Sequence, residues 1–354
     1  MTKEPIFDTA QLAHAELYTP KLEKSVEFFT KLLGMTVVHL EGKSVYLRAY
    51  EDSYIYSLIL TENDEPGLAH VSWRATSENA LYRRVEAIEK TGLGKGWKEE
   101  SYGHGRAYQF RTPNGHNMEI FWEVERYQAP AGQESVLLNR PQRRPLSGVP
   151  VRRIDHINLL TADVEENKDF MVDNLGFNVR EGLIDDEGIY HASWLSVSPI
   201  VHEIALMEDE LGNGNRLHHL AFWYGLPENL NDLSDLCVEY GVPIEAGPLK
   251  QGVSQALCMY IIEPGGNRIE LFGDSGYLIF EPDWEPRRWT GDLKEQAIIW
   301  YGGKLPVTYF RYGTPVINDP IEEANVYFNT PDNLLCDFKF SEFGKPYGVD
   351  KVTK

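Results

Sequence analysis

The sequence predicts an α+β fold of two tandem duplicated domains, each made of two units that run strand, helix and then further strands. Strand and helix patterns alternate along each half of the chain, and the second half repeats the first in register. A region rich in Pro, Gly, Gln and Arg separates the halves at residues 128–150. A length of 354 residues is enough for two domains with substantial cores.

Composition excludes several classes of partner. Hydrophobic residues make up 42% of the chain and charged residues 25%, which is typical of a globular protein. The formal net charge of -20 argues against nucleic acid or an anionic membrane surface as a partner. Cys237, Cys258 and Cys336 are too widely spaced for a disulfide framework or a zinc motif. The chain begins without an apolar signal segment and has no run of membrane-spanning length, so we expect a cytoplasmic, reduced protein.

The first unit begins with a predicted strand over residues 11–20, and a helical pattern follows. Its apolar residues recur at helical spacing: Leu22, Val26, Phe29 and Leu33. Residues 153–178 repeat this plan, from a strand through a helix. Gly34 follows His14 by 20 positions, and Gly176 follows His156 by the same 20 positions. This match in register indicates a duplication, with Gly ending the helix in both copies.

The repeat continues into the second unit of each half. The segment Leu68-Ala-His70 corresponds to Leu217-His-His219, and Pro113 precedes Glu119 by 6 positions, as Pro264 precedes Glu270. Four units therefore begin near His14, His70, His156 and His219. We assign a first domain to residues 1–130, a linker to 131–150, a second domain to 151–290 and a C-terminal extension to 291–354. Within the extension, the polar tail from Glu342 to Lys354 is expected to be frayed.

The stretch from Met259 to Phe272 contains the most informative residue. It predicts two strands joined by the turn sequence Glu263-Pro264-Gly265-Gly266. Glu270 lies between Ile269 and Leu271 in the second of these strands. If its side chain points inward, an unpaired carboxylate costs several kcal/mol, which a metal ion offsets. The alternative is a solvent-facing Glu on a half-exposed strand.

Two more residues at matched positions favour the metal interpretation. His156, His219 and Glu270 lie on three predicted strands far apart in the chain. Two imidazoles and one carboxylate on one face form the facial triad of non-haem Fe(II) oxygenases, which leaves coordination positions open. A single strand histidine is more often a packed core residue, but the recurrence of the set in a duplicated chain favours a metal site.

The chain resembles the extradiol ring-cleaving dioxygenases of the vicinal oxygen chelate superfamily, the catechol and homoprotocatechuate 2,3-dioxygenase group. The resemblance extends to about residue 310. Its motif is Met259-Tyr260, two further residues, an acidic residue, and then Pro264, Gly266 and Glu270. It implies four βαβββ modules of the vicinal oxygen chelate, or glyoxalase-like, fold with the metal site in the C-terminal domain. It also implies that Fe(II), with Mn(II) as the alternative, is held by His156, His219 and Glu270. The repeat selects His219 rather than His218, since His219 aligns with His70.

The same resemblance implies roles around the metal. His202 matches the family's acid–base histidine, and Tyr260 matches the tyrosine that hydrogen-bonds the substrate oxygen. Asn158 and Trp194 match positions that line the substrate pocket. From the residues alone, His202 is equally well explained as a surface strand histidine and Tyr260 as an ordinary strand aromatic.

Two positions depart from the family pattern. Gln251 stands in the sequence Gln-Gly-Val-Ser where the family usually has a histidine, and Gln hydrogen-bonds but does not titrate. We assign Gln251 to the substrate pocket and expect an altered rate or substrate preference. Ala246 stands where homoprotocatechuate-type enzymes have a carboxylate-binding Arg, which favours a neutral catechol. Arg287-Arg288 resembles a second arginine cluster of those enzymes, and this resemblance favours a carboxylated catechol instead.

The implied function is extradiol cleavage of a catechol by dioxygen to a 2-hydroxymuconic semialdehyde-type product, in aromatic catabolism. The alternatives are the same chemistry on a carboxylated or bicyclic catechol, and a non-catalytic member that binds a small molecule. The presence of both His202 and Tyr260 argues against the latter. The resemblance also implies a homo-oligomer, for which we expect a tetramer.

The first domain has its own histidines and glutamate at the aligned positions: His14, His70 and Glu119. The residues around them differ, because Gln109 takes the place of Tyr260 and Tyr56 takes the place of His202. We therefore expect a non-catalytic first domain whose set is a relic of the duplication without a bound ion. Weak residual metal binding is the alternative.

Overall fold

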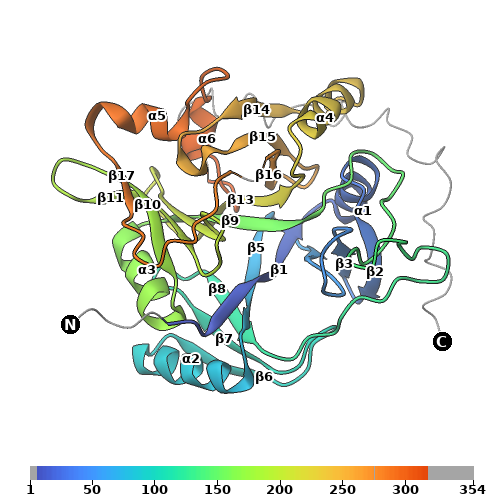
Figure 1. The fold of residues 1–354 in the computed structure, drawn as a ribbon, viewed down its shortest axis with the longest axis horizontal. Helices are drawn as coiled ribbons and strands as arrows, with labels where there is room; N and C mark the ends of the chain where they lie inside the picture. Colours follow the sequence, from blue (N-terminus) through green and yellow to red (C-terminus); the bar gives the residue numbers. More distant parts are fainter. Residues whose placement is uncertain (1–5, 275, 318–354) are drawn as a thin grey trace.

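The computed structural model describes residues 6–274 and 276–317 (Figure 1). The first domain consists of two βαβββ modules, as the sequence predicts. Its first module contains β1 (Thr9–Thr19), α1 (Leu22–Glu27), the π-helical η1 (Phe28–Leu32), β2 (Thr36–Glu41), β3 (Ser44–Arg48) and β4 (Leu58–Glu62). Its second module contains β5 (Gly67–Ala75), α2 (Glu78–Thr91), β6 (Gly94–Lys98), β7 (Ala107–Arg111) and β8 (Asn117–Phe121).

The second domain repeats this order and is followed by further short elements. Its first module contains β9 (Arg153–Thr161), α3 (Val164–Phe170), the π-helical η2 (Met171–Leu175), β10 (Asn178–Ile184), β11 (Tyr190–Ser196) and β12 (Ile204–Glu208). Its second module contains β13 (Arg216–Trp223), α4 (Glu228–Glu239), β14 (Ile244–Lys250), the 3-10 turn η3 (Val253–Gln255), β15 (Leu257–Ile262) and β16 (Arg268–Phe272). The chain continues with β17 (Arg287–Trp289), η4 (Gly291–Leu293), α5 (Lys294–Ile298) and α6 (Val307–Arg311).

Each domain has one sheet, with the first strands of its two modules at the centre. The first sheet has the order β2-β3-β4-β1-β5-β8-β7-β6, and the second has β14-β15-β16-β13-β9-β12-β11-β10-β17. The central pairs β1–β5 and β9–β13 are antiparallel, and β17 pairs in parallel with β10 at the sheet edge. This topology brings the histidines that begin the modules onto adjacent strands.

The helix predicted between Leu22 and Leu33 is confirmed, with one difference. The α-helix ends at Glu27 and the chain continues as a wider π-helical turn, and the second copy does the same after Phe170. Gly34 has φ +61° and Gly176 has φ +80°, the left-handed region that favours glycine. A Cβ at Gly34 would lie 2.7 Å from the carbonyl oxygen of Ser147, so close packing requires glycine there as well.

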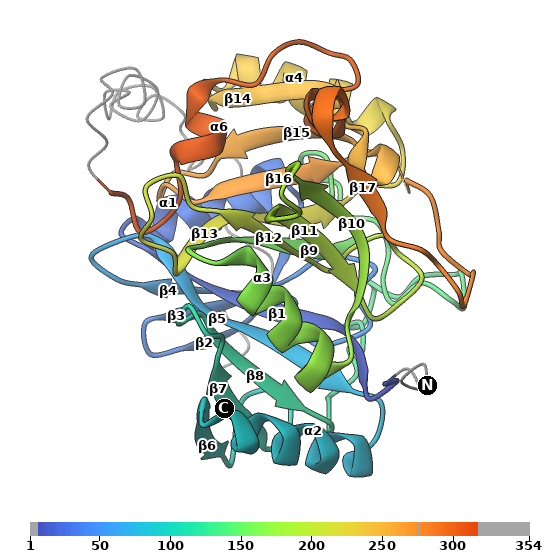
Figure 2. The same cartoon turned by 90° about the vertical axis from the view of Figure 1, so that its left-hand side faces the viewer.

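The two domains share one continuous hydrophobic core. Phe29 of η1 packs edge-on against Phe222 of β13 at 6.1 Å between ring centroids, and Trp73 of β5 packs against Phe177 at 4.9 Å. Helices α2 and α4 lie at opposite ends of the molecule (Figures 1 and 2). The sheets with their central strands therefore occupy the middle, where side chains are most deeply buried.

Residues 123–152, which include the region that the sequence assigns to the linker, contain no helix or strand. The predicted tail from Glu342 to Lys354 and Cys336 lie outside the described residues, and Cys237 and Cys258 are free and buried. Among the residues that the structure describes, no helix combines the length and apolar character needed to cross a membrane.

A buried arginine joins the C-terminal extension to the second domain. Arg268 of β16 is fully buried, and its guanidinium forms an ion pair with Glu245 at 2.5 and 2.8 Å. It also donates hydrogen bonds to the carbonyl oxygens of Thr308 and Tyr312, at 3.0 and 2.9 Å. The extension therefore packs against the second domain through Arg268, and α6 is held next to β16.

Replacement of Glu245 by alanine is expected to lower the free energy of unfolding by about 3–5 kcal/mol, because it leaves a buried guanidinium without its carboxylate. Urea titration followed by tryptophan fluorescence measures this. The control is Glu86→Ala, which removes an exposed i,i+4 partner of Lys90 and is expected to leave the free energy of unfolding nearly unchanged. Equal effects of the two substitutions would contradict the role given to Arg268.

Candidate metal centre

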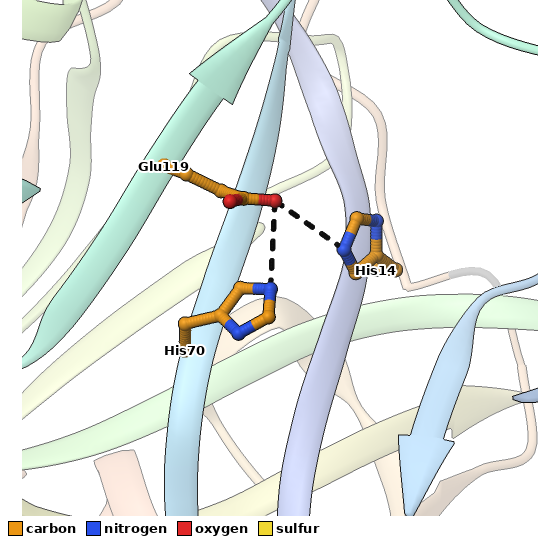
Figure 3. A group of neighbouring side chains, drawn as sticks. All are labelled: His14, His70 and Glu119. Atoms are coloured by element: carbon orange, nitrogen blue, oxygen red, sulfur yellow. Dashed lines mark ion pairs between the residues drawn. The ribbon is translucent and has the colours of Figure 1, made fainter. Parts of the chain in front are cut away.

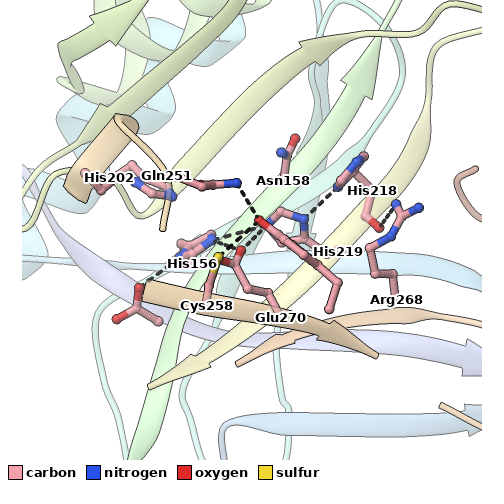
Figure 4. Close-up of polar contacts among 12 residues, drawn as sticks. His156, Asn158, His202, His218, His219, Gln251, Cys258, Arg268 and Glu270 are labelled. Carbon is pink, nitrogen blue, oxygen red and sulfur yellow. Dashed lines mark hydrogen bonds and ion pairs between the residues drawn. The ribbon is translucent and has the colours of Figure 1, made fainter. Parts of the chain in front are cut away.

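Each domain brings together two histidines and one glutamate on three adjacent strands. The first group consists of His14 on β1, His70 on β5 and Glu119 on β8 (Figure 3). The second consists of His156 on β9, His219 on β13 and Glu270 on β16 (Figure 4). The glutamates occupy the same register, because Glu119 pairs with Ser72 and Glu270 pairs with Ala221, two residues after the second histidine of each group. The alignment made from the sequence is therefore confirmed.

The second group is compact and buried. Nε2 of His156 lies 3.2 Å from Nε2 of His219, and one carboxylate oxygen of Glu270 lies 2.9 and 2.8 Å from these two nitrogens. All three side chains are 3% exposed. The solvent-facing alternative for Glu270 is wrong, because its strand is buried on both faces.

Neighbouring groups orient His219 and engage both ring nitrogens of its neighbour His218. Burial and the charge of Arg268 lower the pKa of His218 well below its usual value, so this ring is neutral. Its Nε2 donates to the carbonyl oxygen of Tyr309 at 2.6 Å, which leaves Nδ1 to accept from Nδ1–H of His219 at 2.6 Å. Both nitrogens of His218 are thus engaged, and Nε2 of His219 is free to face Glu270.

Asp155 orients His156 in a similar way. Its carboxylate accepts from Nδ1 of His156 at 2.8 Å, so Nε2 faces Glu270. Burial works to lower the pKa of His156, but Glu270 and Asp155 raise it to about 9. Burial lowers the pKa of His219 to about 4. Burial also works to raise the pKa of Glu270, but the two histidines hold it well below its usual value.

This arrangement fits a divalent metal ion. Two imidazole nitrogens and a carboxylate oxygen face one another across about 3 Å, and this set of electron-pair donors suits a divalent cation. Ligands at about 2.1 Å from an ion and at right angles to one another lie about 3 Å apart. The spacing and the donor set therefore match a facial triad, as the sequence predicts.

Tyr260 and Gln251 lie beside the triad. Tyr260 of β15 pairs directly with Glu270, and its ring centroid is 5.4 Å from that of His219. Gln251 donates from Nε2 to the hydroxyl oxygen of Tyr260 at 3.0 Å, so the hydroxyl hydrogen of Tyr260 is available to a further acceptor. Burial raises the pKa of Tyr260 well above its usual value, which keeps this hydrogen in place.

His202 is also part of the cluster. It lies two residues before β12, is 8% exposed, and its ring centroid is 4.1 Å from that of His156. The alternative of a surface strand histidine is therefore wrong. Its Nδ1 lies 3.1 Å from Oγ of Ser254, which leaves Nε2 for another partner. Burial lowers the pKa of His202 well below its usual value, so the ring is neutral.

Asn158 and Trp194 lie close by in the same sheet. Asn158 of β9 directs Nδ2 to the sulfur of Met207 at 2.9 Å, and its Oδ1 is buried without a hydrogen-bond partner among the described residues. Trp194 of β11 belongs to the small apolar cluster that also contains Tyr260 and Tyr309. Asn158 therefore offers a free acceptor, and Trp194 an apolar surface.

Two further residues, Glu181 and Tyr309, support this site, and the sequence did not identify them. Glu181 of β10 is 1% exposed and accepts hydrogen bonds from the backbone N–H of Ser254 and the indole N–H of Trp289, both at 2.7 Å. It thereby holds the η3 turn, whose Ser254 contacts His202. Tyr309 of α6 packs against Tyr260 at 5.1 Å between ring centroids. Neither residue belongs to a recognisable spacing or to the internal repeat.

A pocket of about 620 Å³ adjoins the site at Gln251. Its lining combines four aromatic rings with two cations and one carboxylate: Glu181, Lys250, Gln251, Gly252, Gln255, Tyr277, Trp284, Arg287, Trp289 and Trp300. Ala246 of β14 is buried in the small apolar cluster and contributes no charge. The pocket can therefore accept an aromatic molecule beside Gln251, with Arg287 at its wall.

Comparison with known proteins gives consistent results. The model of the glyoxalase/bleomycin resistance protein/dioxygenase superfamily matches residues 11–120 and 153–271. A metapyrocatechase from Geobacillus stearothermophilus is 56% identical over 315 residues, 89% of this chain and 96% of the relative. A manganese-dependent 2,3-dihydroxybiphenyl 1,2-dioxygenase from Geobacillus genomosp. 3 is 38% identical over 302 residues, 84% and 95% of the two chains. The crystal structure of homoprotocatechuate 2,3-dioxygenase from Arthrobacter globiformis superposes with a TM-score of 0.79 at 26% identity, covering 89% of this chain and 94% of that one.

Proposed function

The chain belongs to the glyoxalase/bleomycin resistance protein/dioxygenase superfamily, and we propose that it cleaves the ring of a catechol beside its two hydroxyl groups. Dioxygen is the oxidant, and the product is a 2-hydroxymuconic semialdehyde-type compound. The observation that carries this proposal is the buried triad of His156, His219 and Glu270, whose three donor atoms lie within 3.2 Å of one another.

The triad residues hold the metal ion in this proposal. A bound Fe(II) ion, with Mn(II) as the alternative, supplies redox chemistry and open positions that hold the two reactants side by side. His156 and His219 present their Nε2 atoms because Asp155 and His218 fix the other ring nitrogens. The manganese dependence of the relative from Geobacillus genomosp. 3 supports Mn(II) as the alternative ion.

The remaining residues bind the substrate and move protons. The hydroxyl of Tyr260 donates to a substrate oxygen, while its own oxygen accepts a hydrogen bond from Gln251. Oδ1 of Asn158 accepts a hydrogen bond from a substrate hydroxyl, and Trp194 packs against the ring. Neutral His202 takes a proton at Nε2 and later returns it, while Ser254 orients the ring from Nδ1.

A neutral catechol is the favoured substrate. Ala246 supplies no positive charge to the site, and the name of the metapyrocatechase relative denotes cleavage of catechol itself. Two observations favour other substrates. Arg287 at the pocket wall is able to pair with a carboxylate, and the dihydroxybiphenyl dioxygenase relative acts on a bicyclic diol. A non-catalytic binding protein does not need the proton-transfer arrangement of His202 and Ser254.

Oxygen uptake tests the function directly. The protein is loaded without air with Fe(II) or Mn(II), and uptake is followed with catechol, 3,4-dihydroxyphenylacetate and 2,3-dihydroxybiphenyl. We expect the highest kcat/KM with catechol, and one dioxygen consumed per ring opened. Stoichiometric metal without oxygen uptake on any of the three diols would overturn the catalytic proposal. The chain would then be a non-catalytic protein that binds a small molecule.

We also propose a cytoplasmic homotetramer, which follows from the resemblance to the extradiol dioxygenases and from the composition of the chain. Light scattering on the purified protein measures the oligomer. A mass of one or two chains at micromolar concentration would contradict the tetramer.

Gln251 is expected to act through Tyr260. Gln251→Ala removes a buried hydrogen bond of about 1–1.5 kcal/mol, so kcat/KM is expected to fall about 5- to 10-fold. Gln251→His restores a donor to Tyr260 and adds a group that titrates near neutral pH, so activity returns with a new limb in the pH profile. An unchanged kcat/KM for Gln251→Ala would contradict the role of Gln251 in positioning Tyr260 for the substrate.

A further inference from the structure

The carboxylate of Glu181 receives hydrogen bonds from three separate segments of the chain. Its Oε1 accepts from the backbone N–H of Ser254 at 2.7 Å and from the hydroxyl of Tyr277 at 2.9 Å. Its Oε2 accepts from the indole N–H of Trp289 at 2.7 Å. Ser254 lies in η3, Tyr277 follows β16 and Trp289 belongs to β17. One buried side chain of β10 therefore connects η3 to the part of the chain that follows β16.

Strand pairing holds Glu181 in place. β10 lies between β11 and β17 in the second sheet (Figure 2), and Glu181 pairs with Trp194 on one side and with Arg287 on the other. The main chain around the carboxylate is thus fixed from both sides. The η3 turn, by contrast, is a single 3-10 turn of 3 residues outside the sheet. Glu181 is therefore the rigid partner, and η3 is the segment whose conformation depends on the contact.

The η3 turn has a backbone conformation that needs external support. Ser254 has φ +57° and Gln255 has φ +54°, in the left-handed region that residues with a Cβ disfavour. Such residues persist where the surrounding structure determines their conformation. Gly252 ties the start of the turn to α5 through backbone hydrogen bonds of 3.1 Å. Glu181 holds the next part, because its charge-assisted hydrogen bond fixes the N–H of Ser254 itself.

Ser254 connects this carboxylate to the histidine that moves the proton in the proposed reaction. Its Oγ lies 3.1 Å from Nδ1 of His202, while its backbone N–H is held by Glu181. A neutral His202 accepts a proton at Nε2 when Nδ1 carries the ring hydrogen, so Oγ of Ser254 is the acceptor from Nδ1. The position of Oγ follows from the backbone of Ser254. Glu181 therefore controls, through one intervening residue, which tautomer and orientation His202 adopts.

A purely structural explanation for Glu181 is attachment of β17 to the edge of the sheet. One acceptor oxygen for Trp289 is enough for that, and an apolar side chain at this position would avoid the cost of burying a charge. The second oxygen of Glu181 instead contacts Ser254 and Tyr277, which do not belong to β17. This division of the two oxygens favours a role at η3.

We propose that Glu181 is a positioning residue for proton transfer, which fixes η3 so that Oγ of Ser254 holds Nδ1 of His202. The inference rests on the proposed function, because proton transfer by His202 is part of it. Glu181 acts on the reaction through Ser254 and His202 rather than by moving a proton itself. Through Trp289 and Tyr277 it also links the chain after β16 to the orientation of His202.

A double-mutant cycle tests this role. Glu181→Gln keeps the size of the side chain but replaces one acceptor oxygen by an amide that donates, so it does not satisfy all three donors. With Fe(II) loaded, kcat for catechol is expected to fall by up to about 100-fold, while iron content is unchanged and KM changes less. The same substitution is expected to leave kcat unchanged in a His202→Phe or a Ser254→Ala background, because its effect passes through these residues.

Glu263→Gln is the matched control. Glu263 is another buried carboxylate of the second domain, and it accepts hydrogen bonds from the hydroxyl of Ser25 at 2.6 Å and from the N–H of Gly265 at 2.7 Å. This substitution is expected to lower stability and to leave kcat per bound iron unchanged. If Glu181→Gln does not fold, Glu181→Asp serves in the same cycle, because it keeps the charge but withdraws both oxygens from their donors.

Hydrogen exchange measured by mass spectrometry reads the contact without turnover. Peptides that contain Ser254 are expected to exchange faster in Glu181→Gln than in the unmodified chain, whereas those of β9 are not. Unchanged exchange at Ser254, an unchanged kcat, or an equal fall of kcat in the His202→Phe background would each overturn the proposal. If the unmodified chain takes up no oxygen, the proposed function fails and the role of Glu181 in proton transfer fails with it. If it takes up oxygen and the cycle shows equal falls, only the role of Glu181 fails.

Discussion

Replacement of His219 by alanine is expected to abolish iron binding and ring cleavage together, and His156→Ala and Glu270→Ala are expected to do the same. Each substitution removes one of three donor atoms that lie within 3.2 Å of one another in a buried site. With two donors left, the remaining histidine and carboxylate, or the two histidines, do not define the face of an octahedron. Metal analysis after anaerobic loading and oxygen uptake on the same preparation measure both losses.

His218→Ala is the matched control for His219→Ala, because it removes the adjacent histidine. His218 accepts from Nδ1 of His219 and has both nitrogens engaged, so it orients the ligand without binding the ion. Its loss is expected to weaken iron binding by about 10–100-fold, and added iron restores turnover. If a triad variant keeps stoichiometric iron and full turnover, the substituted residue is not a metal ligand. If His218→Ala abolishes binding even at saturating iron, His218 rather than His219 is the ligand.

The grouping of His156, His219 and Glu270 was predictable because duplication provides an internal alignment. His156 and His219 begin modules, and Glu270 follows a Pro-Gly turn at the same distance as Glu119 does in the first half. Residues at matching positions in the two halves lie at matching places in the two sheets, because the first strands of both modules are central and adjacent in each sheet. The fold could be predicted from the same regularity, because each unit repeats one order of strand, helix and strands.

The supporting residues could not be predicted in this way, because they come from segments that the repeat does not relate. Tyr309 reaches the site from α6, after the duplicated modules have ended. Glu181 acts through three separate donors, and no spacing in the chain links it to Ser254. In the first domain, Nε2 of His104 lies 3.5 Å from Oε1 of Glu119. His104 lies 15 positions before Glu119, where the second half has Gln255 before Glu270. A residue that one copy has and the other lacks is invisible to an alignment of the copies, and three-dimensional proximity reveals it.

His202→Phe is expected to retain iron and to lower turnover by about 10²–10⁴-fold, the usual contribution of a positioned acid–base group. Phenylalanine keeps an aromatic ring in the space beside His156, where the two ring centroids are 4.1 Å apart, but it has no nitrogen to carry a proton. Iron content should not change, because His202 lies outside the triad and its Nδ1 faces Ser254. Metal analysis, kcat and KM for catechol are measured on one preparation.

Two further variants test whether His202 acts by proton transfer. His191→Phe is the control, because His191 pairs with Asp185 and Glu208 away from the triad, and its loss should leave kcat unchanged. Ser254→Ala removes the hydroxyl that orients His202 while keeping the imidazole, so it should lower kcat by less than His202→Phe does. A purely structural role for His202 would lower the stability of both His202→Phe and Ser254→Ala, with kcat per bound iron unchanged. Loss of iron in His202→Phe would instead make His202 a ligand. A fall in kcat per bound iron at constant KM and stability leaves proton transfer as the function of this histidine.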